Sequence, residues 1–95
     1  MTQKDYDPAA LDALLANGWA LTQESKALEK TFQFRDFIQA FGWMTRLAIQ
    51  AEKMNHHPEW KNVYRSVTVT LTTHDTGSLT GKDIALAEAM DREAD

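Results

Sequence analysis

Cysteine is absent from this 95-residue sequence, and glycine occurs only four times. Without cysteine the chain can form no disulfide, no thiolate zinc site and no cysteine nucleophile, so we expect a fold without cross-links and a cytoplasmic location. The four glycines form no Gly-x-Ser-x-Gly elbow, no phosphate-binding loop and no dinucleotide-binding fingerprint. Covalent serine catalysis and nucleotide use are therefore disfavoured.

Long apolar runs and an excess of basic side chains are missing as well. Nowhere do about 18 apolar residues follow one another, and the first residues lack the apolar segment of a signal peptide, so we expect neither a membrane span nor export by that route. Fourteen acidic side chains against ten basic ones give a net charge of −4. This balance argues against nucleic acid or an anionic membrane as a direct partner.

The composition is otherwise that of an ordinary folded protein, with 43 % hydrophobic and 25 % charged residues. No internal repeat, low-complexity stretch or linker interrupts the chain. At this length we expect a single domain over residues 1–95, built around one small core.

Two short segments carry helix signals near the ends of the chain. Asp7-Pro8 predicts a helix start, because the carboxylate can cap free amides and proline needs no donor there. Gly77 allows a turn with positive φ, after which Thr80 and Asp83 have the spacing of a capping box. We therefore expect a last helix, with fraying after Asp91.

A longer amphipathic helix is predicted in the middle of the chain, capped by Asp36 and ending near Asn55, because Pro58 forbids continuation. Apolar residues recur there at intervals of three and four, and they define the expected buried face: Phe37, Phe41, Met44, Ala48 and Ala51. Gly42 indicates either close approach of another backbone or simply a tolerated glycine.

Alternating apolar residues predict strands over 19–22, 27–34, 60–64 and 67–74, which form two hairpins. Lys30 interrupts the apolar face of the second strand, which favours a place near a sheet edge. The resulting order is α-β-β-α-β-β-α. It predicts an α+β fold, a two-layer domain with a four-stranded antiparallel sheet and the helices packed on one face.

All three histidines lie close together in the sequence, as His56-His57-Pro58 and His74. Because histidine is the side chain that normally titrates near neutral pH, the cluster indicates a site of proton transfer. A second interpretation stays open, in which a histidine pair at a helix end caps carbonyls or faces solvent. A metal site is disfavoured because adjacent side chains diverge, no His-Glu-x-x-His spacing occurs and cysteine ligands are absent.

Glu52 precedes His56 by four residues, which on a continuous helix places both side chains on the same face. The carboxylate and the carboxyl end of the helix dipole then both favour a protonated His56 that can donate its proton. The same spacing also fits a surface pair that contributes little.

Several blocks of the sequence occur in the order and spacing of a known family. They are Glu52-Lys-Met-Asn-His56-His57-Pro58-Glu-Trp60-Lys-Asn-Val-Tyr64, then Thr72-Thr73-His74, then Leu79 and Asp83, preceded by Phe32-Gln-Phe34-Arg-Asp36-Phe37. From about Gly18 to Asp91 the chain resembles the pterin-4a-carbinolamine dehydratases, also known as dimerisation cofactors of a homeodomain transcription factor. It departs from the family in the turn Gly77-Ser78-Leu79, where the family usually has glycine directly before leucine.

The resemblance implies dehydration of a 4a-hydroxytetrahydropterin to the quinonoid dihydropterin and water, in the recycling of the cofactor of aromatic amino acid hydroxylases, with no metal or organic cofactor. By resemblance, His56 and His74 are the acid/base pair, His57 holds and orients the pterin, and Glu52 orients His56. The substrate-binding residues that it implies, besides the three histidines, are Asn55, Trp60, Thr72, Thr73, Asp75 and Asp83.

The resemblance also implies assembly as a homodimer or homotetramer, through sheet edges and through the long helix. The alternative function is a non-catalytic interaction module on the same fold, such as a transcriptional coactivator or an assembly factor with a protein partner. Because the sequence keeps all three histidines together with Glu52, we favour the enzyme.

Overall fold

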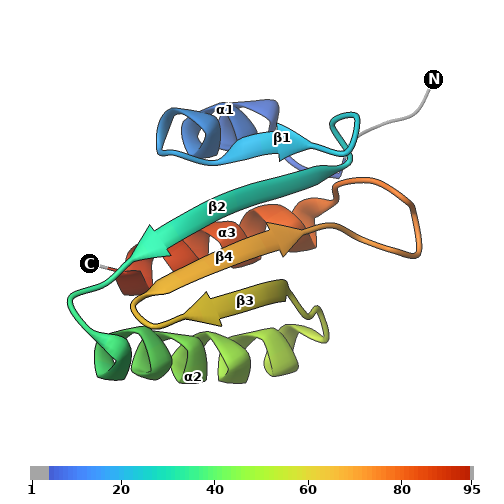
Figure 1. Cartoon of the computed structure of the whole chain (residues 1–95). Helices are drawn as coiled ribbons and strands as arrows, with labels where there is room; N and C mark the ends of the chain where they lie inside the picture. The colour runs from blue at the N-terminus through green and yellow to red at the C-terminus, as the bar shows by residue number, and fades with distance from the viewer. Residues whose placement is uncertain (1–4, 95) are drawn as a thin grey trace.

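The computed structural model describes residues 5–94 and shows an α+β fold (Figure 1). In chain order the elements are α1 (Pro8–Ala16), β1 (Ala20–Thr22), β2 (Ala27–Gln33), α2 (Phe37–Met54), β3 (Glu59–Val63), β4 (Ser66–Leu71) and α3 (Gly81–Ala94). This order is the predicted one. No helix in this part of the chain combines the length and the hydropathy needed to cross a bilayer.

The four strands form one antiparallel sheet in the order β1-β2-β4-β3. Val67, Val69 and Leu71 of β4 are buried, whereas the alternating Thr68 and Thr70 are partly exposed. Side chains from all three helices join the buried residues of β2 and β4 in one hydrophobic core. The predicted sheet, with its helices on one face, is therefore confirmed, and the opposite face is polar.

Lys30 does not mark an edge strand, so that prediction is wrong. β2 lies inside the sheet, between β1 and β4. Lys30 alternates with the buried Leu28 and Phe32, and its ammonium lies 2.8 Å from Oδ1 of Asp91 and 2.7 Å from the carbonyl of Asn17. A charged side chain that has an ion-pair partner can lie at the border of a hydrophobic core. The sequence pattern did not reveal that Lys30 has such a partner.

The ends of α1 and α3 follow the predicted local chemistry. The carboxylate of Asp7 accepts a hydrogen bond from the backbone amide of Ala9 at 2.9 Å. At the start of α3 the amide of Thr80 donates to Oδ2 of Asp83 at 3.0 Å, and the amide of Lys82 donates to the hydroxyl of Thr80 at 3.3 Å. The predicted capping box is confirmed.

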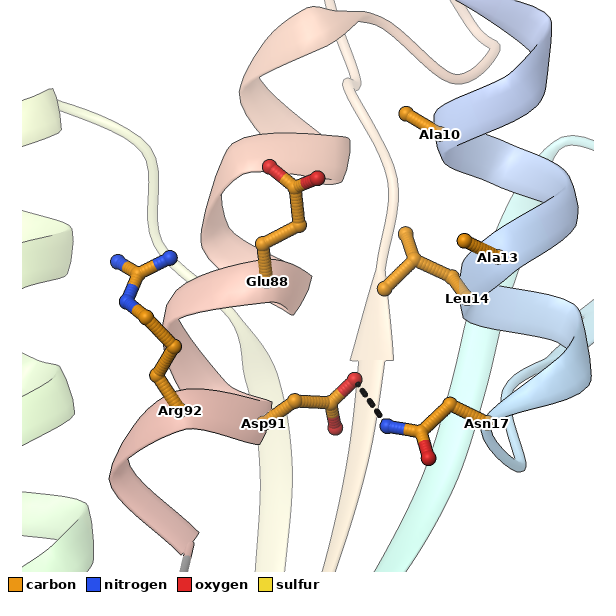
Figure 2. Close-up of a pocket in the computed structure, with 7 residues that line it drawn as sticks. All are labelled: Ala10, Ala13, Leu14, Asn17, Glu88, Asp91 and Arg92. Carbon is orange, nitrogen blue, oxygen red and sulfur yellow. Dashed lines mark hydrogen bonds between the residues drawn. The ribbon is translucent and has the colours of Figure 1, made fainter.

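The last turns of α3 are tied to neighbouring elements. Asp91 accepts a hydrogen bond from the amide group of Asn17 at 2.9 Å (Figure 2), and Glu93 pairs with Arg46 of α2 at 3.0 Å. The helix continues to Ala94. The predicted fraying after Asp91 is therefore wrong, because these tertiary contacts hold the terminal turn.

The long helix α2 begins and ends as predicted. The carboxylate of Asp36 accepts a hydrogen bond from the amide of Gln39 at 2.8 Å, and Asn55 adopts the left-handed conformation that ends the helix. Of the two interpretations of Gly42, close approach of another backbone is absent from the described residues, since a Cβ placed there would meet only the guanidinium of Arg46, at 3.6 Å. That position is simply a tolerated glycine.

The buried face of α2 differs from the predicted one. Its buried residues are Ala40, Trp43, Leu47 and Ala51. Of the expected set only Ala51 is buried; Met44 is half-buried, Ala48 is exposed, and Phe37 and Phe41 are 46 % and 55 % exposed. The apolar residues of α2 fit two overlapping helical faces, and the fully buried Trp43, whose indole donates to the carbonyl of Met90 at 3.1 Å, decides between them.

Candidate active site

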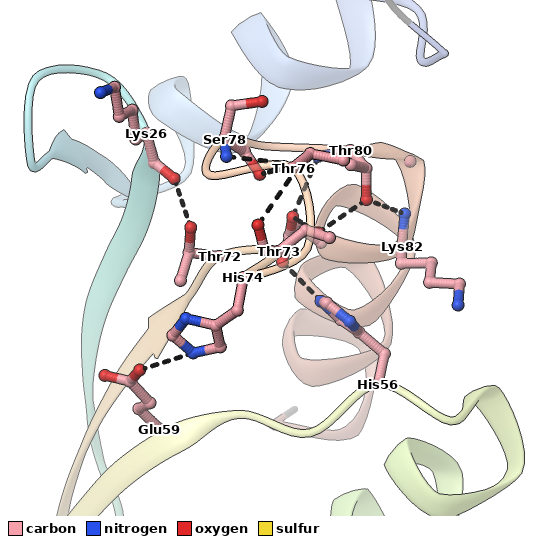
Figure 3. Close-up of polar contacts among 12 residues, drawn as sticks. Lys26, His56, Glu59, Thr72, Thr73, His74, Thr76, Ser78, Thr80 and Lys82 are labelled. Carbon is pink, nitrogen blue, oxygen red and sulfur yellow. Dashed lines mark hydrogen bonds and ion pairs between the residues drawn. The ribbon is translucent and has the colours of Figure 1, made fainter.

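All three histidines of the chain line one pocket of about 310 Å³. The residues come from the end of α2, the turn after β4 and the first turn of α3: Asn55, His56, His57, Thr72, Thr73, His74, Asp75 and Lys82. Figure 3 shows His56, Thr72, Thr73, His74 and Lys82 around this region. The fold thus brings together the three histidines that the sequence analysis singled out.

Lys82 is the lining residue that sequence reasoning missed. The available signal in the sequence was its position directly before Asp83, in the capping box that follows the turn containing His74.

The end of α2 presents the first two histidines to the pocket. Asn55 has φ of 52°, and the amide of His56 donates to the carbonyl of Ala51 at 3.0 Å, which closes the helix. Pro58 then prevents a further helical turn. The chain therefore leaves the helix axis at Asn55, and His56 and His57 no longer follow helical spacing.

The turn after β4 presents the third histidine. Residues 74–77 form a turn closed by an isolated bridge between Thr73 and Ser78. Gly77 has φ of 66°, as the sequence predicted, and its amide donates to the carbonyl of Thr73 at 2.9 Å. The hydroxyl of Thr72 donates to the carbonyl of Lys26 at 2.6 Å, which ties the turn to the loop before β2 (Figure 3).

A buried carboxylate holds His56. Its Nε2 lies 2.6 Å from Oδ1 of Asp83, and the two residues are 9 % and 0 % exposed. The other carboxylate oxygen, Oδ2, accepts from the hydroxyl of Thr73 at 2.6 Å and from the amide of Thr80 at 3.0 Å. Because a carboxylate only accepts, Nε2 of His56 carries the shared proton, and Nδ1 is the nitrogen left to exchange a proton with a bound molecule.

Glu52 does not contact His56, and this prediction is wrong. Its Oε1 lies instead 2.8 Å from Nε2 of His57. The four-residue spacing rule requires a continuous helix, whereas α2 ends at Met54 and Asn55 is left-handed. The side chains of Glu52 and His57 are 80 % and 60 % exposed, so water screens this pair.

His74 has a carboxylate partner of its own. Its Nε2 lies 3.1 Å from Oε1 of Glu59, the first residue of β3 (Figure 3). Glu59 was not predicted, although it lies inside the block His56-His57-Pro58-Glu59-Trp60. Each histidine of the pocket is therefore paired through Nε2 with a different carboxylate.

Trp60 and Asp83 do not line the pocket, contrary to their predicted contact with substrate. Trp60 packs against the core, with its ring centroid 6.2 Å from that of Trp43. Asp83 has no exposed surface, so it can act on a bound molecule only through the pocket residues that it contacts, His56 and Thr73. The other substrate-binding residues predicted from the sequence line the pocket.

A second hollow, of about 410 Å³, lies between α1 and α3 (Figure 2). Two acidic residues line it, Glu88 and Asp91, and Asp91 already accepts hydrogen bonds from Asn17, Trp19 and Lys30. No group of three or more potential metal ligands is found within residues 5–94. The histidine pocket is therefore the candidate active site.

Known proteins resemble this chain over nearly its whole length. Two relatives carry the name "Putative pterin-4-alpha-carbinolamine dehydratase". The protein from Roseobacter denitrificans is 57 % identical over 81 residues, covering 85 % of this chain and 83 % of the relative. The protein from Jannaschia sp. is 55 % identical over 97 residues, covering 99 % of each.

Two solved structures share the fold. A transcriptional coactivator/pterin dehydratase from Brucella melitensis has a TM-score of 0.85 and 39 % identity, covering 98 % of this chain and 100 % of the other. A pterin dehydratase-like protein, identified as a RuBisCO assembly factor in the alpha-carboxysome, has a TM-score of 0.70 and 23 % identity, covering 81 % and 89 %. Residues 2–93 match the family model of pterin 4 alpha carbinolamine dehydratase, and the chain therefore belongs to this family.

Proposed function

We propose that this protein dehydrates a 4a-hydroxytetrahydropterin to the quinonoid dihydropterin and water, and so recycles the tetrahydropterin cofactor of aromatic amino acid hydroxylases. The observation that carries the proposal is the convergence of His56, His57 and His74 on one pocket. Family membership and the names of the relatives support a pterin dehydratase.

The reaction needs two proton transfers. The hydroxyl on carbon 4a leaves as water once it receives a proton, and nitrogen N5 loses its proton as the double bond between N5 and carbon 4a forms. We assign these transfers to His56 and His74. Asp83 holds His56 so that Nδ1 can exchange a proton, and its negative charge stabilises the positive charge on the ring during turnover.

The remaining lining residues are proposed to bind the substrate. His57, which Glu52 contacts, holds and orients the pterin. Asn55, Thr72 and Asp75 offer hydrogen bonds to the polar edge of the pyrimidine ring. Thr73 acts indirectly, through Asp83, because its hydroxyl donates a hydrogen bond to that carboxylate.

The direct test supplies freshly generated 4a-hydroxytetrahydropterin and follows quinonoid formation by ultraviolet absorbance. The wild type accelerates the reaction, and His56→Ala and His74→Ala lower kcat by about 10² or more. Glu29→Gln, a change on a neighbouring strand outside the pocket, is the control and retains the wild-type rate. A wild-type rate equal to the uncatalysed rate overturns the proposal.

We also propose that the protein forms a homodimer or homotetramer and acts in the cytoplasm without a metal or organic cofactor. Four large apolar side chains of α2 are 46–81 % exposed: Phe37, Ile38, Phe41 and Ile49. Such a surface supports association. Light scattering of the purified chain tests the oligomeric state, and a monomer at micromolar concentration contradicts it.

A second candidate function is a non-catalytic interaction module. The names of the two structural neighbours, a transcriptional coactivator/pterin dehydratase and a RuBisCO assembly factor, favour it. A variant lacking all three histidines separates the two functions. If the protein is only a binding module, the variant keeps its partner and the wild type shows no dehydratase activity.

A further inference from the structure

We propose that Glu59 is a positioning residue for His74, holding the imidazole in place at the pocket. This inference rests on the proposed function, because His74 is one of the two groups assigned to proton transfer. Nε2 of His74 lies 3.1 Å from Oε1 of Glu59, within the range of an ion pair. The contact is attractive to the extent that the ring is charged.

His74 has little else to hold it. Its side chain is 77 % exposed and extends from the turn over residues 74–77. Within residues 5–94 the contact with Glu59 is the one polar interaction of the ring. His56, by contrast, is 9 % exposed and hydrogen-bonded to a buried carboxylate. Of the two proposed proton-transfer groups, His74 therefore depends more on a single neighbour.

Glu59 is well placed to supply that support. It is the first residue of β3 and registers with Thr70 of β4, so the sheet fixes its backbone. Thr70 precedes the histidine turn on the adjacent strand, which brings the carboxylate beside the ring (Figure 3). Glu59, on a regular strand, thus orients His74, on a turn. Side chains on strands are held more precisely than side chains on loops, and catalysis depends on precise geometry.

The charges around His74 are mixed, and Glu59 is the carboxylate in contact with the ring. The other titratable groups lining the pocket are Asp75 beside it in the turn, His56 and His57 from the end of α2, and Lys82 from α3.

Glu29 offers a matched control. It lies on β2 and registers with Thr70 from the other side of β4, so Glu29 and Glu59 flank the same threonine across the sheet. Its carboxylate accepts from the hydroxyl of Thr70 at 3.3 Å and does not line the pocket. Glu29→Gln therefore removes one negative charge from the same row of the sheet without touching a histidine.

The test compares Glu59→Gln, Glu59→Asp and Glu29→Gln with the wild type in two measurements. Steady-state kinetics with 4a-hydroxytetrahydropterin give kcat and KM separately. Nitrogen-15 correlation spectra of the imidazole rings at pH 7, assigned with His74→Ala, report the contact at Nε2 of His74 without any substrate. Because the pair is solvent-exposed, we expect Glu59→Gln to lower kcat by about two- to fivefold with KM nearly unchanged.

The expected spectra show a changed Nε2 signal of His74 in Glu59→Gln, a signal closer to the wild type in Glu59→Asp, and no change in Glu29→Gln. An unchanged His74 signal in Glu59→Gln overturns the inference, and so does a fall in kcat that Glu29→Gln matches. If the wild type fails to dehydrate the pterin, the proposed function is lost, while the spectra still decide whether Glu59 acts on His74.

Discussion

Replacing Asp83 by asparagine tests whether one buried carboxylate orients His56. The side chain keeps its shape but exchanges one accepting oxygen for a donating amide. In the structure both oxygens accept: Oδ1 from Nε2 of His56, and Oδ2 from the hydroxyl of Thr73 and the amide of Thr80. Asparagine can satisfy only one side of this arrangement.

Two orientations of the new amide are possible, and each carries a distinct cost. If the amide oxygen faces His56, the amide nitrogen meets the backbone N–H of Thr80, and a buried donor loses its acceptor at a cost of about 1–3 kcal/mol. If the amide is reversed, its nitrogen donates to Nε2 of His56, which forces the ring proton onto Nδ1. The nitrogen assigned to proton exchange is then already protonated.

Both orientations also remove the negative charge beside His56. We therefore expect Asp83→Asn to lower kcat by about 10² or more and to lower the melting temperature, by about 4–8 °C for each kcal/mol lost. Dehydration kinetics and thermal unfolding followed by circular dichroism measure the two effects. Asp91→Asn, on the same helix, is the matched control: it breaks the contacts with Lys30 and Asn17 and lowers stability, but leaves kcat unchanged. A folded Asp83→Asn variant with wild-type kcat refutes the role of Asp83.

Three further outcomes follow from the same structure. Thr73→Val removes the 2.6 Å hydrogen bond to Asp83, so we expect a loss of about 1–2 kcal/mol in urea unfolding together with a lower kcat; an unchanged midpoint contradicts this. Gly77→Ala places a side chain at φ of 66° and costs about 1 kcal/mol in the same assay, whereas equal stability contradicts the strain. Dialysis against a chelator leaves kcat unchanged, because the proposed proton transfers use imidazoles; loss of activity that zinc restores points to a metal mechanism.

The sequence predicted the order of elements because its signals are local. Asp7, Asp36 and the pair Thr80 and Asp83 cap helices through contacts within a few residues, and the structure contains each of these hydrogen bonds. Alternation along β4 likewise identified its buried face, with Val67 among the fully buried residues. Each of these patterns is set by residues of a single helix or strand.

Predictions failed where distant contacts decide, as two examples show. The apolar residues of α2 fit more than one helical face, and burial of Trp43 against α3 selects the face that leaves Phe41 exposed. Lys30 looked like an edge residue because its partner, Asp91, is 61 residues away in the sequence. Neither pairing could be recognised from spacing alone.

In the candidate site, too, local signals predicted some residues correctly and distant contacts decided the rest. The adjacency of His56 and His57 and the resemblance to the family identified most of the pocket lining, but the carboxylate assigned to His56 was the wrong one. Helical spacing suggested Glu52, whereas the left-handed turn at Asn55 directs His56 to Asp83. Asp83, predicted to cap a helix and to bind substrate, proved to be the partner of the histidine, because one carboxylate both caps α3 and holds His56.

The double role of Asp83 has a consequence for synthesis of the protein. His56 leaves the ribosome 27 residues ahead of the carboxylate that holds it. Until that carboxylate emerges and the first turn of α3 forms, a nascent chain contains the imidazole but not its anchor. A chain that ends before Asp83 therefore lacks the carboxylate that holds His56.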